Sequence, residues 1–465
     1  MLPLRLQTLD FPLPGGWQQA LAHALAQPHA CILDSALPGE LSRQSIIAFA
    51  PAMWFSATGQ SVTFQRARHG SRLEGDPIDL FARVVHHAQA EMPLRSPLKP
   101  GFCGGWMGLF GFDLRCFVER LPWPRPQGPL FPDLAAGFYP WCLRLDHSTE
   151  RCELRLLAGV PGGPASVHEL AEELSRLFQR PTPASAACRL GLPCLHTSRD
   201  AWLEQVRQVK RHIFEGDIYQ ANLTRMISRE GELDTSTLYT ALRRLNAAPF
   251  GGYLDCGLGR RLLSSSPEQF LTLADGLLET RPIKGTRPRG ADAAQDAALK
   301  QELLASEKDR AELTMIVDLE RNDLGRISEP GSVQVPKLAA CHSYARVHHL
   351  EATVQGRLRA GLDIGRILRA TFPGGSISGA PKKRALEIIH ELEPVRRGPY
   401  TGSLFALGVD GSLTSNILIR TLLQEPGRVS YHVGCGITAE SDPQAEWDET
   451  LAKADALERA LEASC

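Results

Sequence analysis

The sequence predicts an α/β fold of the α+β type, because strand patterns and helix patterns both occur along the whole chain. Short apolar runs at residues 45–49, 53–57 and 61–64 are separated by turn residues, which is typical of a strand meander. Apolar residues at helical spacing over residues 167–178 predict an amphipathic helix. After residue 198, strands and long helices alternate as far as the C-terminus. A large mixed core is therefore expected.

A proline-rich stretch at residues 180–183 separates two predicted domains in this chain of 465 residues. Ser198 can cap the first helix that follows the stretch. The apolar stripe of that helix consists of Trp202, Val206, Val209 and Ile213. We expect an N-terminal domain over residues 1–185 and a second domain over residues 195–463.

The composition excludes several classes of partner. The chain has 51 Lys and Arg residues and 52 Asp and Glu residues, which gives no reason to expect nucleic acid or an anionic membrane surface as partner. No segment approaches the roughly 20 apolar residues of a membrane span, and the N-terminus lacks the apolar stretch of a signal peptide. The eleven cysteines contain no C-x-x-C pair, so neither a disulfide framework nor a thiolate zinc site is expected. We expect a cytoplasmic protein that binds small molecules or proteins.

Lys284 is the candidate nucleophile of the chain. It stands between Ile283, which would anchor a strand end, and Gly285, which lets the backbone approach a ligand closely. Three arginines lie in the same turn segment: Arg281, Arg287 and Arg289. Their positive charge would favour the neutral, nucleophilic form of a partly buried lysine. The alternative is an ordinary loop cation.

Three glutamates predict a site for a hard divalent cation. Glu312 lies one turn before the apolar residues of a predicted helix, which places its carboxylate on the buried face. Glu446 and Glu449 share one face of another helix near the C-terminus. Carboxylates from separate helices, without a nearby His or Cys cluster, suit Mg²⁺. The alternatives are ion pairs of Glu312 with an arginine and of Glu449 with Lys453.

Two glycine turns are candidate anion sites. The turn at residues 372–384 precedes a predicted helix, whose first amides attract anions. Ala380 and Pro381 stand where a phosphate-binding loop needs Lys and Ser or Thr, so a carboxylate is expected instead. The second turn covers residues 434–438, and Arg420 ends an apolar strand where it could bind a carboxylate. Either turn could instead be only structural.

Four motifs together resemble the chorismate-utilising enzyme family: residues 283–286, residues 309–323, residues 373–382 and residues 434–449. Their order and spacing match over roughly residues 195 to 460, and the N-terminal half resembles the preceding domain of the synthase components. The resemblance implies a large sandwich, with two antiparallel β-sheets packed face to face and helices outside. Residues 195–463 would then form the chorismate-binding catalytic domain.

Lys284 and Gln220 distinguish the branches of this family. Anthranilate-forming and isochorismate-forming members carry alanine where this chain has Lys284, whereas lysine is typical of the para-aminobenzoate branch. Gln220 stands where isochorismate-forming and salicylate-forming members have a lysine that activates water. The resemblance therefore implies amination of chorismate at C4 to 4-amino-4-deoxychorismate, in the synthesis of para-aminobenzoate and folate. The alternatives are anthranilate synthase component I activity and a non-catalytic tryptophan-binding subunit.

The resemblance also assigns roles to single residues. Glu312 and Glu449, with Glu446 assisting, would hold Mg²⁺ against the ring carboxylate of chorismate. Lys284 would attack C2, Glu268 would protonate the leaving C4 hydroxyl, and His349 matches the active-site histidine of the family. The expected substrate contacts are Gly285, Thr286, Ser378, Arg420, Gly434, Cys435, Gly436 and Thr438.

A second subunit and a second ligand are also implied. The chain has no recognisable Cys-His-Glu glutaminase unit, so ammonia would come from solution or from a glutamine amidotransferase subunit in a heterodimer. The region where family members bind tryptophan corresponds to Ser35, Arg43, Pro249, Phe250 and Gly251. Two departures from the family pattern are expected near the enolpyruvyl pocket: Phe405-Ala406 in place of Gly-Tyr, and Thr414 in place of aspartate.

Overall fold

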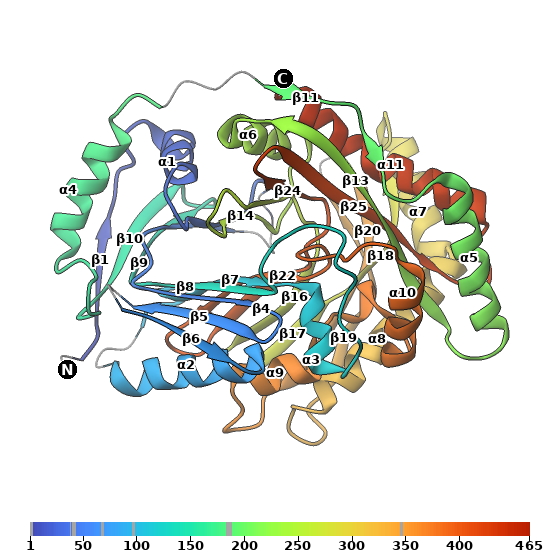
Figure 1. The fold of residues 1–465 in the computed structure, drawn as a ribbon, viewed down its shortest axis with the longest axis horizontal. Coiled ribbons are helices and arrows are strands. Elements are labelled where there is room, and N and C mark those ends of the chain that lie inside the picture. The colour runs from blue at the N-terminus through green and yellow to red at the C-terminus, as the bar shows by residue number, and fades with distance from the viewer. Residues whose placement is uncertain are drawn as a thin grey trace.

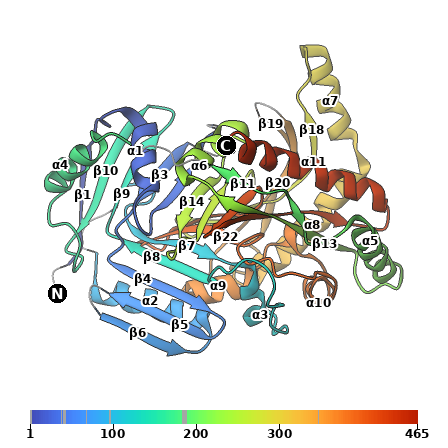
Figure 2. The same cartoon turned by 45° about the horizontal axis from the view of Figure 1, so that its top comes forward.

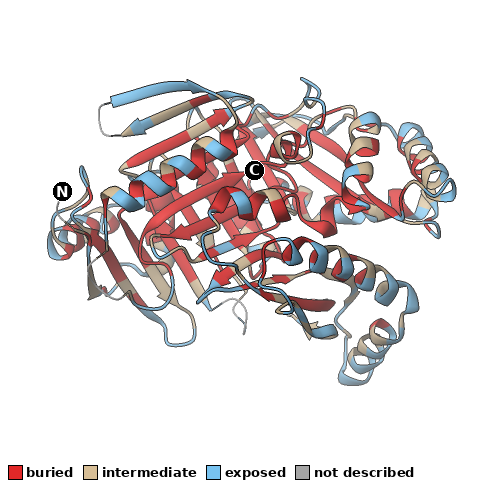
Figure 3. Ribbon diagram, turned by 90° about the horizontal axis from the view of Figure 1, so that it is seen from below, coloured by how far each residue is buried: buried red, intermediate tan, exposed pale blue. Residues whose placement is uncertain are grey.

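Two antiparallel β-sheets packed face to face form the centre of the protein in a computed structural model (Figure 1). The structure describes residues 3–37, 39, 43–66, 69–94, 98–182, 188–344 and 347–465. One apolar cluster contains Ile46 and Leu262 from the first sheet together with Met107 and Leu404 from the second, so it lies between them. Buried residues concentrate in the strands, and exposed residues follow the outward faces of the helices (Figure 3). The predicted sandwich is therefore confirmed.

The first sheet contains thirteen strands within the described residues. Their order is β1 (Arg5–Asp10), β10 (Arg151–Ala158), β9 (Trp141–Asp146), β3 (Gln44–Ala48), β2 (Cys31–Asp34), β14 (Gly251–Asp255), β15 (Arg261–Ser264), β24 (Thr421–Glu425), β25 (Arg428–Ile437), β13 (Gln220–Glu232) and β11 (Arg189–Leu190). Two short strands pair with β13: β12 (Cys194–Leu195) and β21 (Gly379–Ala380). This sheet contributes β25, which lines the site described below.

The second sheet contains twelve strands within the same ranges. Their order is β18 (Ile283–Pro288), β20 (Val347–Arg357), β17 (Leu277–Arg281), β16 (Gln269–Ala274), β23 (Leu413–Asn416), β22 (Ser403–Gly408), β7 (Gly105–Phe110), β8 (Leu134–Tyr139), β4 (Met53–Thr58), β5 (Ser61–Arg66) and β6 (His69–Glu74). β19 (Gln334–Ser343) pairs with β20. The candidate nucleophile Lys284 lies on β18, at one end of this sheet.

Helices lie outside the two sheets (Figure 2). Those near the first sheet include α1 (Gly16–Leu25), α4 (Val167–Phe178), α5 (Arg199–Phe214), α6 (Thr235–Leu245), α10 (Lys382–Leu392) and α11 (Pro443–Glu462). Those near the second include α2 (Pro77–Glu91), α7 (Ala293–Ala305), α8 (Glu307–Gly325) and α9 (Ile364–Thr371). Among the described residues, three short helices complete the fold: the α-helix α3 (Arg115–Val118) and the 3₁₀ helices η1 (Phe112–Leu114) and η2 (Gly375–Ile377). None of the described helices is both long enough and apolar enough to cross a lipid bilayer.

Side-chain caps start the helices that carry or support the site. Ser198 accepts a hydrogen bond from the Ala201 amide, as predicted, and Ser306 accepts one from the Asp309 amide at the start of α8. Asp442 accepts from the amides at the start of α11, which has Pro443 in its first turn. These local signals fix where α8 and α11 begin, and therefore where their glutamates emerge.

Both sheets take strands from each side of the proline-rich stretch. β2 pairs with β14 in the first sheet, and β7 pairs with β22 in the second. The expected boundary at residue 185 lies outside the described residues, and the division into two domains stays a prediction. The expected meander is divided between the sheets, because β3 belongs to the first sheet whereas β4 and β5 belong to the second.

One disulfide bond is present, although the sequence predicted no disulfide framework. Cys188, next to β11, and the C-terminal Cys465 form a disulfide with a Cα–Cα distance of 4.8 Å. The two residues are 277 positions apart in the sequence, so their spacing gave no indication of contact. The other nine cysteines are free thiols.

Candidate active site

A cavity of about 860 Å³ is enclosed by β18 and β20 of the second sheet, β25 of the first sheet, and the helices α8 and α11. All but two of the expected catalytic, substrate and metal residues line it: Glu268, Lys284, Gly285, Thr286, Glu312, His349, Arg420, Gly434, Cys435, Gly436, Glu446 and Glu449. The fold therefore brings together residues that lie as far apart as 268 and 449 in the chain.

Ser378 and Thr438 are the two expected contacts that do not line this cavity. The Ser378 side chain is fully buried, and its hydroxyl donates to the Gly374 carbonyl at 2.8 Å. The Thr438 amide donates to the Ser441 hydroxyl at the start of α11. Both residues shape turns next to the cavity, and neither places its side chain in the lining.

A bulge at Gly285 sets the position of Lys284. The register of β18 against β20 shifts between Lys284 and Thr286, and Gly285 has a φ of +69°, which favours glycine. A Cβ atom added to Gly436 on β25 would lie 3.2 Å from the Lys284 Nζ atom. The amine therefore lies directly over a glycine of the opposite sheet. In the described part of the chain this amine makes no hydrogen bond or ion pair.

The three arginines near Lys284 do not act as the sequence suggested. Each is paired with a carboxylate, at N–O distances of 2.6, 2.6 and 2.7 Å: Arg281 with Glu279, Arg287 with Glu302, and Arg289 with Asp296. A guanidinium with a carboxylate at this distance contributes little net field farther away. These arginines therefore do not supply unpaired positive charge at Lys284.

Glu268 is a buried carboxyl group beside Lys284. Burial raises its pKa to about 7, although the Ser376 hydroxyl and the positive charge of Lys284 act in the opposite direction. The Glu268 backbone amide donates a hydrogen bond to the Ser266 hydroxyl at 3.2 Å, which fixes the backbone at this residue. A carboxyl group with this pKa is protonated in a large fraction of molecules at neutral pH, so it can donate a proton.

His349 faces Thr286 across the register of β18 and β20. The Thr286 Oγ1 atom lies 2.9 Å from the His349 Nδ1 atom. Burial, with the nearby charge of Arg420, lowers the pKa of His349 to about 4. The imidazole is therefore neutral at physiological pH and holds the Thr286 side chain in place.

Two glutamates of α11 form the centre of a candidate metal site. Ligand atoms of Glu446, Glu449 and Cys435 all lie within 4.8 Å of one another. Burial raises the pKa of the Cys435 thiol well above its usual value, and its Sγ atom donates to the Glu446 carbonyl at 3.5 Å. A protonated thiol is a poor ligand for a hard cation, so the two carboxylates are the donors that suit Mg²⁺.

Glu312 of α8 also lines the cavity, but the structure does not bring it into that group. Burial raises its pKa, Lys284 and Lys308 lower it, and the charge of Glu446 raises it further. The negative charge of Glu446 therefore acts on the Glu312 carboxyl group. The sequence placed Glu312 on the buried face of its helix, whereas in the structure it is half-buried at the cavity edge.

The alternative in which Glu449 pairs with Lys453 is observed, and the Lys453 side chain, which is about half exposed, also lines the cavity. Its amine lies 2.7 Å from the Glu449 carboxylate and donates to the Gly434 carbonyl at 2.8 Å. Burial acts to raise the pKa of Glu449, yet the charges of Lys453, Lys284 and Lys308 outweigh it and lower the pKa. The spacing of four residues had indicated the pair, but not its position inside the site.

Arg420 and Tyr400 form a second polar wall. Arg420 lines the cavity, burial lowers its pKa, and its guanidinium has no partner among the residues described. Tyr400 also lines the cavity and stacks on His432, with ring centroids 5.2 Å apart. Tyr400 and His432 were missed in the sequence. The glycine-rich segment around Tyr400 was the one signal that could have indicated it.

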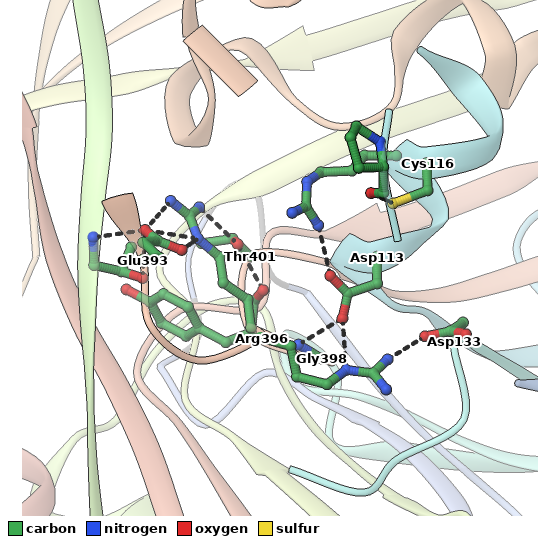
Figure 4. Close-up of polar contacts among 12 residues, drawn as sticks. Asp113, Cys116, Asp133, Glu393, Arg396, Gly398 and Thr401 are labelled. Atoms are coloured by element: carbon green, nitrogen blue, oxygen red, sulfur yellow. Dashed lines mark hydrogen bonds and ion pairs between the residues drawn. The ribbon is translucent and has the colours of Figure 1, made fainter. Parts of the chain in front are cut away.

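A buried ion-pair network holds the segment that carries Tyr400 (Figure 4). Arg396 bonds Asp113 and Asp133 of the N-terminal half. Arg397, which is 1% exposed, pairs with Glu393 at 2.7 Å and also donates to Thr401. The segment is therefore fixed on both sides by charged side chains.

Neither departure from the family pattern lies in the cavity lining. Phe405 is fully buried and stacks on Phe110, with centroids 3.8 Å apart. Thr414 is exposed and faces Ala406 across β22 and β23. The expectation that these positions border the enolpyruvyl pocket is corrected, because their strands direct them to the core and to the surface.

The residues of the expected tryptophan region make mostly structural contacts. The Ser35 hydroxyl bonds the carbonyls of Gln44 and Pro249, and Gly251 pairs with β2. Phe250 pairs through its amide with Ser266. Arg43 is exposed and donates to the Ser148 hydroxyl.

Comparisons with known proteins agree with this geometry. The family model described as chorismate binding enzyme matches residues 31–459. The chain is 40% identical to aminodeoxychorismate synthase component 1 of Klebsiella aerogenes, over 94% of each chain. It is 39% identical to anthranilate synthase component 1 of Streptomyces coelicolor, over 82% of this chain and 77% of that one. Anthranilate synthase component I from Streptococcus pneumoniae superposes with a TM-score of 0.78 at 28% identity, covering 90% of this chain and 93% of the other.

Proposed function

Because the chain belongs to the chorismate binding enzyme family, we propose that it replaces the C4 hydroxyl of chorismate with an amino group from ammonia. The product would be 4-amino-4-deoxychorismate, the precursor of para-aminobenzoate in folate synthesis. The observation that carries the proposal is the Lys284 amine, which lines the cavity without a partner in the described chain and lies beside the proton donor Glu268. Relatives named aminodeoxychorismate synthase component 1 support it.

Two walls of the cavity suit the two carboxylates of chorismate. Arg420 offers a desolvated guanidinium, which would bind the enolpyruvyl carboxylate together with Tyr400 and the amides near Gly436. Gly285 and Thr286 would line the ring, with Thr286 oriented by His349. The ring carboxylate would then face Glu446 and Glu449.

Mg²⁺ is the metal that we propose for this second wall. Glu446 and Glu449 supply close carboxylate oxygens, which are the ligands that a hard cation prefers, and Glu312 of α8 lines the same cavity. When bound, Mg²⁺ would neutralise the ring carboxylate and stabilise charge that develops on the ring. Lys453 keeps Glu449 oriented and compensates its charge.

The residues of this chain suit a substitution in two steps. The Lys284 amine would attack C2 while the double bonds shift and the C4–O bond breaks. Glu268 would give its proton to the departing hydroxyl, which leaves as water. Ammonia would then add at C4, the double bonds would shift back, and the C2–N bond to Lys284 would break.

The ammonia source that we propose is a glutamine amidotransferase subunit in a heterodimer. The name component 1 of the relatives refers to one part of a two-part enzyme, and the chain has no recognisable glutaminase unit of its own. A cytoplasmic location belongs to the same proposal, since nine of the eleven cysteines are free thiols, as in a reducing compartment, and only Cys188 and Cys465 are paired among the described residues. Tryptophan is the least supported ligand, because Arg43 bonds Ser148 instead.

Product identification tests this proposal. The protein is incubated with chorismate, ammonium and Mg²⁺, and the products are separated and weighed by mass spectrometry. We expect a product that keeps the enolpyruvyl group and carries an amino group in place of a hydroxyl. Anthranilate synthase component I activity is the second candidate, favoured by the relative of Streptomyces coelicolor. Fluorescent anthranilate with release of pyruvate would overturn the proposal in its favour.

A further inference from the structure

Arg225 is a buried cation on β13 that the proposed chemistry does not use. It is 1% exposed, and its Nε atom donates to the Thr450 hydroxyl of α11 at 2.9 Å. Its guanidinium carbon lies 4.3 Å from the centre of the Trp447 ring. The Thr450 hydroxyl in turn donates to the Trp447 carbonyl at 2.7 Å. The Arg225 side chain therefore contacts two residues of the same turn of α11.

Stability alone does not account for a guanidinium at this position. The Nη1 and Nη2 atoms of Arg225 have no hydrogen-bond partner in the described chain, and no described carboxylate pairs with them. Burial lowers the pKa of the group, which reflects the cost of keeping the charge out of water. An apolar side chain of similar volume would avoid this cost. A second role is therefore indicated.

The two residues that Arg225 contacts alternate with the proposed metal ligands. Trp447 directly follows Glu446, and Thr450 directly follows Glu449. Carboxylate oxygens stand about 6 Å from a helix axis, so a rotation of the helix by about 20° moves them by about 2 Å. That shift is roughly ten times the tolerance of about 0.2 Å in a metal–ligand distance. The rotation of α11 therefore decides whether both glutamates can share one ion.

We propose that Arg225 is a positioning residue for the metal site. It fixes the rotation of α11 through Trp447 and Thr450, so that the carboxylates of Glu446 and Glu449 face the cavity together. The inference rests on the proposed function, which assigns these two glutamates to Mg²⁺.

Arg229 offers a matched control on the same strand and the same helix. Its Nη1 atom pairs with Glu458 of α11 at 2.8 Å. Glu458 lies more than two turns beyond Glu449, so this contact holds α11 to β13 away from the metal ligands. Loss of Arg229 weakens the docking of α11 without releasing the turn that carries Glu446 and Glu449.

The test measures binding of Mn²⁺, a substitute for Mg²⁺, by electron paramagnetic resonance of the free ion, so that no turnover is required. We expect Arg225→Met to weaken Mn²⁺ binding by at least about tenfold, Arg225→Lys to recover part of the loss, and Arg229→Met to stay within about twofold of the wild type. Equal affinities in Arg225→Met and Arg229→Met would overturn the inference.

Two further variants keep the test decisive. If Arg225→Met does not fold, Thr450→Val removes only the hydroxyl that Arg225 grips, and we expect it to weaken Mn²⁺ binding by about threefold or more. Wild-type affinity in both Thr450→Val and Arg225→Lys would overturn the inference. The double variant Glu446→Gln, Glu449→Gln must lose Mn²⁺ binding. If the double variant retains Mn²⁺ binding, the metal assignment itself is overturned, and this inference with it. If the double variant loses Mn²⁺ binding while Arg225→Met binds Mn²⁺ as tightly as the wild type, only this inference is overturned.

Discussion

Two carboxyl groups of the site differ in charge because of their surroundings. Glu268 is buried, and its pKa is raised to about 7, whereas the lysines around Glu449 lower the pKa of that group. One group is therefore suited to donate a proton and the other to bind a cation. The sequence placed both residues in the site, but it could not give this difference, since it depends on which side chains surround each carboxyl group in the fold.

Glu268 predicts a pH dependence of activity. A proton donor must hold its proton, so amination should decline as the pH rises through about 7. Glu268→Gln should lower kcat by about 10²-fold or more and remove this decline. The measurement is the pH profile of kcat for both proteins. An unchanged profile in the variant would exclude Glu268 as the donor.

The same group predicts a pH dependence of stability. The folded pKa of about 7 lies above the ordinary value of 4.5, so the carboxyl stabilises the folded state below pH 4.5, and this contribution is lost as the pH rises through 7. The loss amounts to about 3 kcal/mol. Urea unfolding at pH 4.5 and pH 8 should show that the free energy of unfolding falls less in Glu268→Gln than in the wild type. Equal decreases would contradict the raised pKa.

At the scale of single elements, β25 gives the amine its space. Gly436 leaves room for Lys284 and for the Gln220 side chain, whose Nε2 atom would lie 2.4 Å from an added Cβ. Gly436→Ala should therefore displace both groups and lower kcat by about 10²-fold without unfolding the protein. Gly325→Ala is the control, because nothing lies within 4 Å of its added Cβ. Steady-state kinetics on both variants checks this, and wild-type kcat in Gly436→Ala would contradict it.

The segment with Tyr400 depends on Arg397. Removing this guanidinium leaves the Glu393 carboxylate buried without its cation. Arg397→Met should therefore lower the free energy of unfolding by about 3–5 kcal/mol. Chemical denaturation measures the change. The variant Arg428→Met, whose Glu425 partner lies in a less buried pair, should lose clearly less, and equal losses would argue against the role of the network.

Local sequence signals were sufficient for many elements and insufficient for contacts between them. The cap at Ser198 predicted a helix start, because such a signal acts within a few residues. The face of Phe405 and the cavity position of Lys453 depend on packing between elements. The same spacing of four residues would suit a solvated helix, so the pair of Lys453 and Glu449 could not be placed from the sequence.

At the scale of the whole molecule, the two halves of the chain complete each other's sheets. The first sheet passes from β2 to β14 and the second from β7 to β22, so both cross between halves. Such long-range pairing leaves no local pattern in the sequence, which explains why a boundary near residue 185 was expected from composition alone. Unpaired strand edges and apolar faces would be exposed in either half by itself.

Separate production of residues 1–185 and 195–463 tests this interlocking. We expect neither piece to fold cooperatively alone, and we expect co-produced pieces to purify together and unfold in one transition. Differential scanning calorimetry of each preparation provides the measurement. Two independent transitions, or a cooperative transition in an isolated piece, would show instead that the halves are separate domains.

The covalent role of Lys284 is the central claim, and intact-protein mass spectrometry tests it most directly. The protein is mixed with chorismate and Mg²⁺ in the absence of ammonia, and then digested to locate any added mass. We predict an adduct of chorismate minus one water on the peptide that contains Lys284, and its disappearance when ammonium is added. Amination by a protein whose Lys284 stays unmodified, or by Lys284→Ala at the wild-type rate, would contradict the account.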